Sequence, residues 1–254
     1  MASLLEISDV SVRFGGLVAV DGVSLAVGAG EICALIGPNG AGKTTLFNAV
    51  SGNAAISSGR ILLKGEPIHG LAPHQISAKG VRRTFQNGGL FAGLTALENV
   101  LVGLHAKVGS GFLGLLAGAR ASERAESSST EQARALLDLM EVGHIADELA
   151  SDLSGGQQRI VEIVRAIATE PPLLLLDEPA VGLAPHMREQ LVRIIRRLAA
   201  EQGVGILLIE HAIELVMAVA DRVVVLNYGR KVADAPPEQV RADKAVLEAY
   251  LGHA

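Results

Sequence analysis

Alternation of apolar and polar residues marks the beginning of the chain. Residues 4–13 and 23–27 follow this pattern, which predicts two half-buried antiparallel strands. Residues 31–36 are mostly apolar and run into a Gly-Pro-Asn-Gly sequence, as expected of a buried strand that enters a loop. A helix is predicted over residues 43–50 and another strand over residues 60–64. This part of the chain therefore combines an antiparallel β region with a strand, a loop and a helix.

The second half of the chain alternates short apolar runs with helical patterns. Residues 173–176, 205–209 and 222–226 are expected to form buried strands, and residues 187–200 a helix between two of them. Because strand and helix in alternation are typical of a parallel sheet, the predicted fold class is α/β.

The sequence between these two parts follows a different pattern. Residues 87–150 contain several helical stretches and no strong strand, so we expect a helical subdomain there. The α/β core, with the antiparallel β region, would then comprise residues 1–86 and 151–235. Residues 236–254 begin with two prolines and continue as a short amphipathic helix, which predicts a C-terminal helical tail.

Composition narrows the possible classes of protein. With 49 % apolar and 19 % charged residues among 254, the chain can bury a large core and is not a disordered protein. Mean hydropathy is +0.37, yet no apolar run approaches the roughly 18–20 residues of a membrane span. Residues 1–10 lack the basic start of a signal peptide, so we expect a cytoplasmic chain. The net charge of −5 argues against nucleic acid as a partner.

A glycine-rich stretch matches the phosphate-binding pattern GxxxxGK[ST]. Its backbone N–H groups are expected to surround phosphate oxygens, with Lys43 reaching the β- and γ-phosphates and Thr44 offering a hydroxyl to Mg²⁺. The alternative is a glycine-rich turn that binds nothing; the predicted strand before the stretch and helix after it favour a nucleoside triphosphate site. The candidate ligand-binding residues are Gly37, Pro38, Asn39, Gly40, Ala41, Gly42, Lys43, Thr44 and Thr45.

Two acidic residues follow the apolar strand of residues 173–176. Asp177 is placed to hold Mg²⁺ through water, and Glu178 to orient and deprotonate an attacking water. A strand that ends in Asp-Glu is more often only a polar strand terminus. Together with the phosphate loop, however, the pair predicts ATP hydrolysis.

A Leu-Ser-Gly-Gly-Gln sequence precedes an amphipathic helix. Ser154 is a good N-cap, and the simple interpretation is an ordinary capped helix. The functional interpretation is a second phosphate contact at the helix N-terminus. Because the phosphate loop already provides one such contact, a second one implies that another chain's nucleotide is bound. The candidate residues are Ser154, Gly155, Gly156 and Gln157.

The phosphate loop, the LSGGQ sequence and the LLLLDE strand together resemble the ATP-binding subunits of ABC transporters, over essentially the whole chain. The resemblance implies a phosphate-loop NTPase fold with a RecA-like core, an antiparallel β subdomain and a helical insertion. It implies that Phe14 stacks on adenine, that Gln86 contacts Mg²⁺ and the attacking water, and that His211 contacts the γ-phosphate. Ala184 departs from the family, which usually has Asp there. The implied cofactors are ATP and Mg²⁺.

Within this family the chain is similar to the branched-chain amino acid importers. The matching stretches are residues 13–20, 81–86, 178–183 and 209–211, and residues 111–120 and the C-terminal ending resemble the larger of that system's two ATPases. The implied partners are a second ATPase subunit (a paralogue or a copy of this chain), two membrane permease subunits and, indirectly, a solute-binding protein, at the cytoplasmic face of the inner membrane.

Other functions remain open at this point. Importers of urea or short amides and the lipopolysaccharide-export ATPase share part of the resemblance. A soluble ABC ATPase that acts on DNA or ribosomes would be expected to be more basic and to carry coiled coils or two fused ATPase units. A small-molecule kinase would have no use for the LSGGQ sequence.

Overall fold

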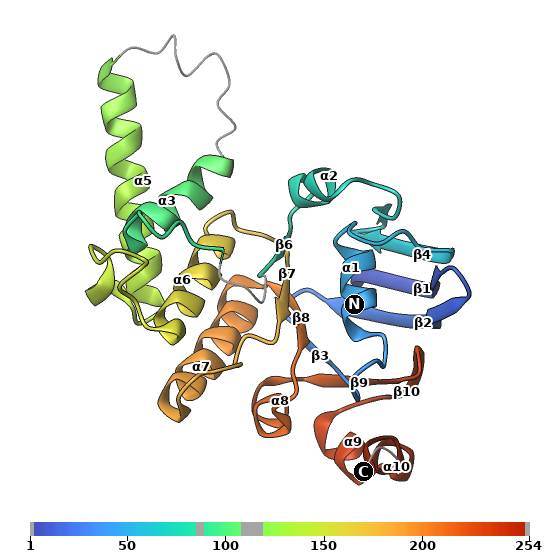
Figure 1. Cartoon of the computed structure of the whole chain (residues 1–254). Coiled ribbons are helices and arrows are strands. Elements are labelled where there is room, and N and C mark those ends of the chain that lie inside the picture. Colours follow the sequence, from blue (N-terminus) through green and yellow to red (C-terminus); the bar gives the residue numbers. More distant parts are fainter. Residues whose placement is uncertain (1–2, 85–88, 108–118, 252–254) are drawn as a thin grey trace. The chain divides into compact units, whose positions relative to one another are not determined.

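The structure, a computed structural model, describes residues 3–84, 89–107 and 119–251 (Figure 1). Contacts divide the chain into two compact units. The first unit comprises residues 1–83, 172–180 and 192–254. The second unit comprises residues 84–171 and 181–191.

One of the two sheets in the first unit is antiparallel, with the strand order β2-β1-β4-β5 (Figure 1). Its strands are β1 (Ser3–Phe14), β2 (Leu17–Gly28), β4 (Ser58–Leu63) and β5 (Glu66–Pro67). β1 pairs with both β2 and β4, and buried positions recur along β1 and β2 as the alternating sequence predicts. The predicted antiparallel β region is confirmed.

The second sheet has the order β10-β9-β3-β8-β7-β6 and is parallel except for β10. Its strands are β3 (Ile32–Ile36), β6 (Val81–Arg83), β7 (Leu173–Asp177), β8 (Gly205–Ile209), β9 (Arg222–Asn227) and β10 (Arg230–Ala235). Every residue of β3, β7 and β8 is buried, which explains their continuous apolar runs. The sequence did not predict the edge strands β6 and β10. β6 pairs in parallel with β7, although all of the second unit's first segment separates them in the chain.

Helices cover both faces of this parallel sheet. They are α1 (Lys43–Val50), α2 (Pro73–Ala78), α8 (Ile213–Val219), α9 (Pro237–Ala242) and α10 (Lys244–Leu251). Leu35 of β3 packs in the core that contains Phe47 of α1. Its neighbour Ile36 belongs to a second core with Val240 and Val246 of the C-terminal helices. Strand β3, which leads into the phosphate loop, is therefore held from both sides.

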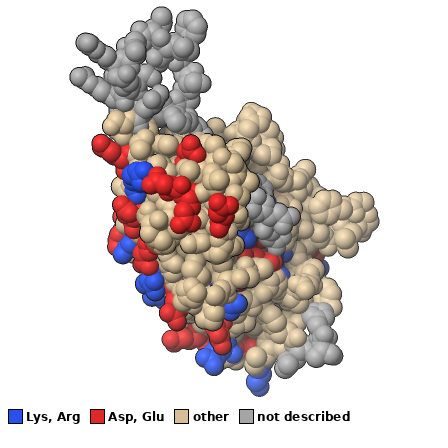
Figure 2. Space-filling model, turned by 60° about the vertical axis from the view of Figure 1, so that its left-hand side comes forward, with Lys and Arg blue, Asp and Glu red and all other residues tan. Residues whose placement is uncertain are grey.

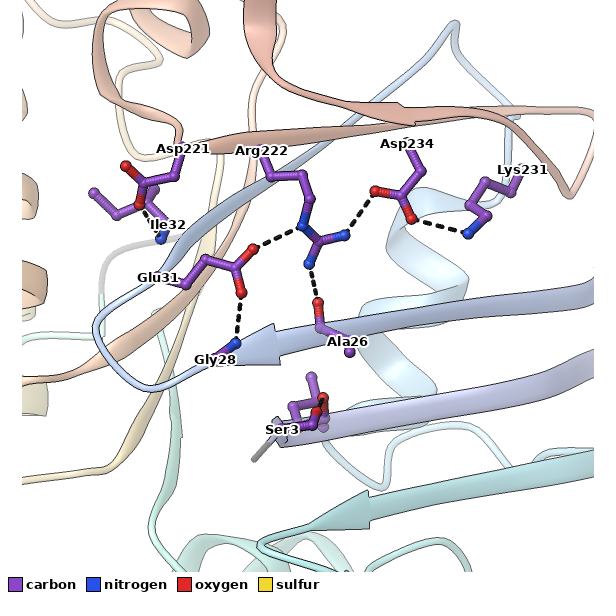
Figure 3. A network of polar contacts seen from close by, with 10 residues as sticks. Ser3, Ala26, Gly28, Glu31, Ile32, Asp221, Arg222, Lys231 and Asp234 are labelled. Carbon is purple, nitrogen blue, oxygen red and sulfur yellow. Dashed lines mark hydrogen bonds and ion pairs between the residues drawn. The ribbon is translucent and has the colours of Figure 1, made fainter. Parts of the chain in front are cut away.

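A polar network joins β2, β3, β9 and β10 (Figure 3). Arg222 of β9 donates to Oε1 of Glu31 at 2.7 Å, to Oδ1 of Asp234 at 2.6 Å and to the carbonyl of Ala26. Glu31 also accepts from the backbone N–H of Gly28 at 2.6 Å. Because these groups come from both sheets, the network fixes the antiparallel sheet to the parallel one.

The second unit is helical in the residues that the structure describes. Its helices are α3 (Ala96–Lys107), α5 (Ala119–Leu139), the 3-10 helix η1 (Gly143–Ile145) and α6 (Gly155–Ile167). Helix α7 (Pro185–Gln202) begins in this unit and ends in the first. α6 packs against α3, so residues 151–171 group with the helical unit rather than with the core, where the sequence interpretation placed them. Much of the segment 111–120 lies outside the described residues.

The surface carries charges of both signs. Figure 2 shows acidic and basic side chains interspersed, and among the described residues of that face no continuous basic patch is seen. Within the described ranges, no helix combines the length and the apolar character needed to cross a membrane.

Candidate active site

A cleft of about 470 Å³ lies at the phosphate loop of the first unit. Five separate segments of the chain line it. The lining residues are Phe14, Leu17, Val18, Ala19, Asn39, Gly40, Ala41, Gly42, Lys43, Thr44, Thr45, Glu178, His211, Tyr228 and Gly229. Most candidates predicted in this unit, from Phe14 at the end of β1 to His211 just after β8, therefore surround one space.

The backbone of the phosphate loop needs glycine at its two ends. Gly37 has a φ of 147° and Gly42 a φ of 98°, values that L side chains rarely adopt. A Cβ at Gly42 would lie 2.5 Å from the carbonyl oxygen of Ala19, and one at Gly37 would overlap the carbonyl of Leu226. The conformation of the loop is therefore set by close packing against β2 and β9.

Lys43 is almost completely buried at the N-terminus of α1, with 6 % of its surface exposed. Its Nζ donates to the carbonyl oxygens of Gly37 at 2.7 Å and Pro38 at 3.0 Å. Burial lowers the pKa of this ammonium group, and the nearby carboxylates of Glu178 and Asp177 partly raise it again. The loop thus holds a preformed cation whose hydrogen bonds are satisfied by its own carbonyls.

Asp177 ends β7 with a buried carboxylate. Its Oδ2 forms an ion pair with Nη2 of Arg83 at 2.7 Å, while its Oδ1 is buried with no hydrogen-bond partner among the described residues. A buried carboxylate oxygen with an open position, in the same unit as the Thr44 hydroxyl, suits a hard cation such as Mg²⁺. Gln86, the third predicted Mg²⁺ contact, lies outside the described residues. The residues present fit the ion.

Glu178 and His211 meet at the cleft. Oε1 of Glu178 lies 3.0 Å from Nε2 of His211. The two residues follow the neighbouring parallel strands β7 and β8, and the backbone N–H of Glu178 donates to the carbonyl of Ile209 at 2.9 Å. Glu178 has a backbone φ of 48°, a left-handed conformation that is uncommon for residues other than glycine. The pair forms an acid–base arrangement that faces the phosphate loop across the cleft.

The sequence interpretation missed a buried carboxylate behind this pair. Glu210 accepts hydrogen bonds from the backbone N–H groups of Ala180 at 2.8 Å, His211 at 3.0 Å and Ala212 at 3.3 Å. It therefore fixes the loops that carry both Glu178 and His211. Its position at the end of a fully apolar strand, like that of Asp177, was the available signal.

Ser154 and its neighbours begin α6 in the second unit. The Ser154 Oγ accepts from the backbone N–H of Gln157 at 3.3 Å, and the Gln157 Oε1 accepts from the backbone N–H of Ser154 at 2.9 Å. This is a capping box, so the capped-helix interpretation is confirmed. A Cβ at Gly156 would lie 3.0 Å from Cε of Met187. The contact of this segment with phosphate stays a prediction.

Ala184 lies exposed immediately before α7, where its carbonyl accepts from the N–H of Arg188 at 3.1 Å. Tyr228 and Gly229, in the turn between β9 and β10, line the cleft without having been predicted. Nothing in the local sequence marked this turn, because the strand that follows it was itself not recognised.

The chain matches known proteins over almost its whole length. The family model described as ABC transporter matches residues 20–181, and one described as branched-chain amino acid ATP-binding cassette transporter matches residues 230–254. The branched-chain amino acid transport ATP-binding protein BraF of Pseudomonas aeruginosa is 45 % identical over 251 residues, covering 99 % of this chain and 98 % of BraF.

Two solved structures resemble the chain closely. The ADP conformation of MJ1267, an ATP-binding cassette of an ABC transporter, has a TM-score of 0.85 and 31 % identity, covering 99 % of this chain and all of that one. A dimeric post-hydrolysis state of the cassette MJ0796, bound to ADP and Pi, has a TM-score of 0.76 and 25 % identity, with 92 % and 98 % covered.

Proposed function

The chain belongs to the ABC transporter family of ATP-binding subunits, and from this premise we propose that it hydrolyses ATP to power an importer of branched-chain amino acids. The observation that carries the proposal is the convergence of the phosphate loop, Glu178 and His211 on one cleft. The substrate class is supported by the match of residues 230–254 and by the similarity to BraF. Related importers of urea or short amides are the alternatives.

In the proposed mechanism, the backbone N–H groups of residues 39–45 bind the phosphate oxygens of ATP. Lys43 exchanges the carbonyls of Gly37 and Pro38 for the β- and γ-phosphates. Because its ammonium group is already buried and held at the site, little reorganisation accompanies this exchange. Phe14, whose side chain is 55 % exposed at the edge of the cleft, is available to stack on adenine.

Thr44 and Asp177, together with Gln86, would hold Mg²⁺. When bound, the ion supplies positive charge that neutralises the transferring phosphoryl group. The rest of the chemistry belongs to side chains of the chain itself.

Glu178 orients the attacking water and accepts its proton at the carboxylate. The water oxygen bonds to the γ-phosphorus as the bond from phosphorus to the bridging oxygen of ADP breaks. His211, 3.0 Å from Glu178, keeps the carboxylate in place and contacts the γ-phosphate. Glu210 acts as a positioning residue for both, through its three backbone hydrogen bonds.

The second half of the site comes from another subunit. The N-terminus of α6 is exposed at Ser154 and carries backbone donors that suit a γ-phosphate. In the proposed assembly, two ATPase subunits close over two nucleotides, each bound by one chain's phosphate loop and the other's Ser154 segment. ATP binding closes the pair and hydrolysis opens it. Two permease subunits at the cytoplasmic face of the inner membrane convert this motion into transport.

The test is the molar mass of the Glu178→Gln variant by light scattering, with and without ATP and Mg²⁺. Blocked hydrolysis is expected to trap a closed dimer, so the mass should double with ATP. The Lys43→Met variant serves as the control that cannot respond. A mass that stays monomeric although ATP binds would favour an obligate pair with a second ATPase. Absence of ATP binding would overturn the whole mechanism.

A further inference from the structure

Arg83 contacts several side chains beside Asp177, and the catalytic mechanism above gives it no role. Its Nη1 donates to Oδ1 of Asn48 at 2.7 Å and to Oγ of Ser51 at 3.1 Å, and its Nη2 to Asp177 at 2.7 Å. The guanidinium carbon also lies 5.7 Å from the centre of the Phe47 ring. The side chains of Arg83 and Asp177 are 10 % and 4 % exposed. Helix α1 thus fixes a cation against the carboxylate proposed to hold Mg²⁺.

The negative charge of Asp177 is largely offset before nucleotide binds. Asp177 is paired with Arg83, and Lys43 lies close enough to Asp177 and Glu178 for both carboxylates to raise its pKa. The further carboxylate of Glu210, behind Glu178, is held by three backbone N–H groups. A divalent cation that arrives alone therefore meets an Asp177 carboxylate that already has a counter-charge, and it would lose bound water there for little electrostatic gain.

We propose that Arg83 is a resident counter-cation of Asp177 that prevents Mg²⁺ from binding until the nucleotide supplies its phosphates. This inference rests on the proposed function, because it takes Asp177 as the metal carboxylate. With ATP present, the negative charge of the triphosphate outweighs the charge of Arg83, and the open Oδ1 of Asp177 becomes a favourable contact for the ion or its water. The metal would then bind together with ATP rather than before it.

A buried ion pair that serves only stability would behave differently. Removing one partner of such a pair destabilises the fold because the other charge stays buried and unpaired. If Arg83 also competes with the metal, the same change leaves an uncompensated carboxylate at the site. Metal binding without nucleotide should then tighten, which a purely structural role does not predict.

The experiment measures the binding of Mn²⁺, by electron paramagnetic resonance, to the full chain without nucleotide. Arg83→Gln removes the charge and keeps amide donors for Asn48 and Asp177. We expect it to bind Mn²⁺ on the order of tenfold more tightly than the wild type. This corresponds to the shift of about one pKa unit that one neighbouring charge causes in a carboxylate. Arg83→Lys, which keeps the charge, should bind as weakly as the wild type. Equal affinity in the wild type and Arg83→Gln would overturn the proposal.

Two controls separate the causes. Arg222→Met removes another partly buried guanidinium from ion pairs in the same unit, in the network of Figure 3, and should leave Mn²⁺ affinity unchanged. In Arg83→Gln combined with Asp177→Asn, the tenfold gain should vanish. Should Arg83→Gln fail to fold, Asn48→Ala loosens the guanidinium without removing either charge, and a gain of roughly twofold is expected. No gain in that variant would also contradict the proposal.

Failure of the proposed function gives a different result. If Asp177→Asn binds Mn²⁺ as tightly as the wild type in the presence of ATP, Asp177 is not the metal carboxylate. If Asp177→Asn loses that binding while Arg83→Gln shows no gain without nucleotide, only the counter-cation role of Arg83 fails.

Discussion

The phosphate loop and the Ser154 segment are both predicted to bind phosphate, yet they are built in contrasting ways. The loop depends on glycine conformations and close packing, and its lysine is satisfied by carbonyls of the loop itself. The Ser154 segment is an ordinary capped helix start whose first donors are satisfied by a serine and a glutamine. The unusual backbone of the phosphate loop therefore indicates a binding site from one chain alone. The regular start of α6 does not, because a helix cap alone explains its geometry.

The largest effect is expected from a change in the phosphate loop itself. Lys43→Met should lower ATP hydrolysis at least 100-fold, the scale of losing one preorganised electrostatic contact. Folding should not suffer, because burial lowers the pKa of Lys43. The folded state therefore disfavours the protonated ammonium group of Lys43, which lowers the free energy of unfolding at neutral pH. This destabilisation disappears as the pH rises toward and past 10.5, the pKa of the lysine in the unfolded chain. ATPase assays and thermal melting at pH 7 test both statements; a variant that hydrolyses ATP at half the normal rate would contradict the first.

An intermediate effect is expected at the other half of the site. Ser154→Ala removes the cap and should cost about 1 kcal/mol of folding stability. It should also weaken ATP-dependent dimerisation while the monomer binds ATP normally, because the phosphate loop is untouched. Chemical denaturation, nucleotide titration and light scattering provide the three measurements.

Ser154→Asp is the matched control for this change. Aspartate is an equally good cap, so stability should stay near that of the wild type, but its negative charge faces the γ-phosphate in the proposed dimer. Dimerisation of Ser154→Asp as strong as that of the wild type would argue against any phosphate contact here.

The smallest expected effect concerns the edge of the cleft. Phe14→Ala should weaken ATP binding roughly two- to tenfold, since aromatic stacking contributes about 0.5–1.5 kcal/mol. Phe14→Tyr keeps the ring and should bind ATP normally. Fluorescent-nucleotide titration distinguishes these outcomes. An unchanged affinity in Phe14→Ala would mean that Phe14 does not stack on adenine and is only the last residue of β1.

Much of the fold follows from the sequence because its central strands are fully buried. The apolar runs of β3, β7 and β8 mark these strands to within a residue or two. β6 and β10 escaped prediction for opposite reasons. β6 has only three residues and exists through its pairing with β7, while β10 carries charged residues along an edge. Neither gives a periodic signal of its own.

The candidate site also contains residues that the sequence predicts and residues that it does not. Lys43, Asp177 and Glu178 are recognisable because each belongs to a local motif beside a predicted strand. Arg83 acts on Asp177, a residue 94 positions away in the sequence, and the backbone partners of Glu210 include one 30 positions away. Contacts of this kind depend on which strands become neighbours, and a single sequence without an alignment does not specify that.

The pairing of β6 with β7 has a consequence for the order of folding. These strands become neighbours only after the chain has closed a loop that contains residues 84–171. For a flexible chain of this length the entropic cost of closure is on the order of 4 kcal/mol. A segment that has already become compact through its own helices closes such a loop more readily. We therefore expect β6 to be added late, so that Arg83 reaches Asp177 among the last contacts to form.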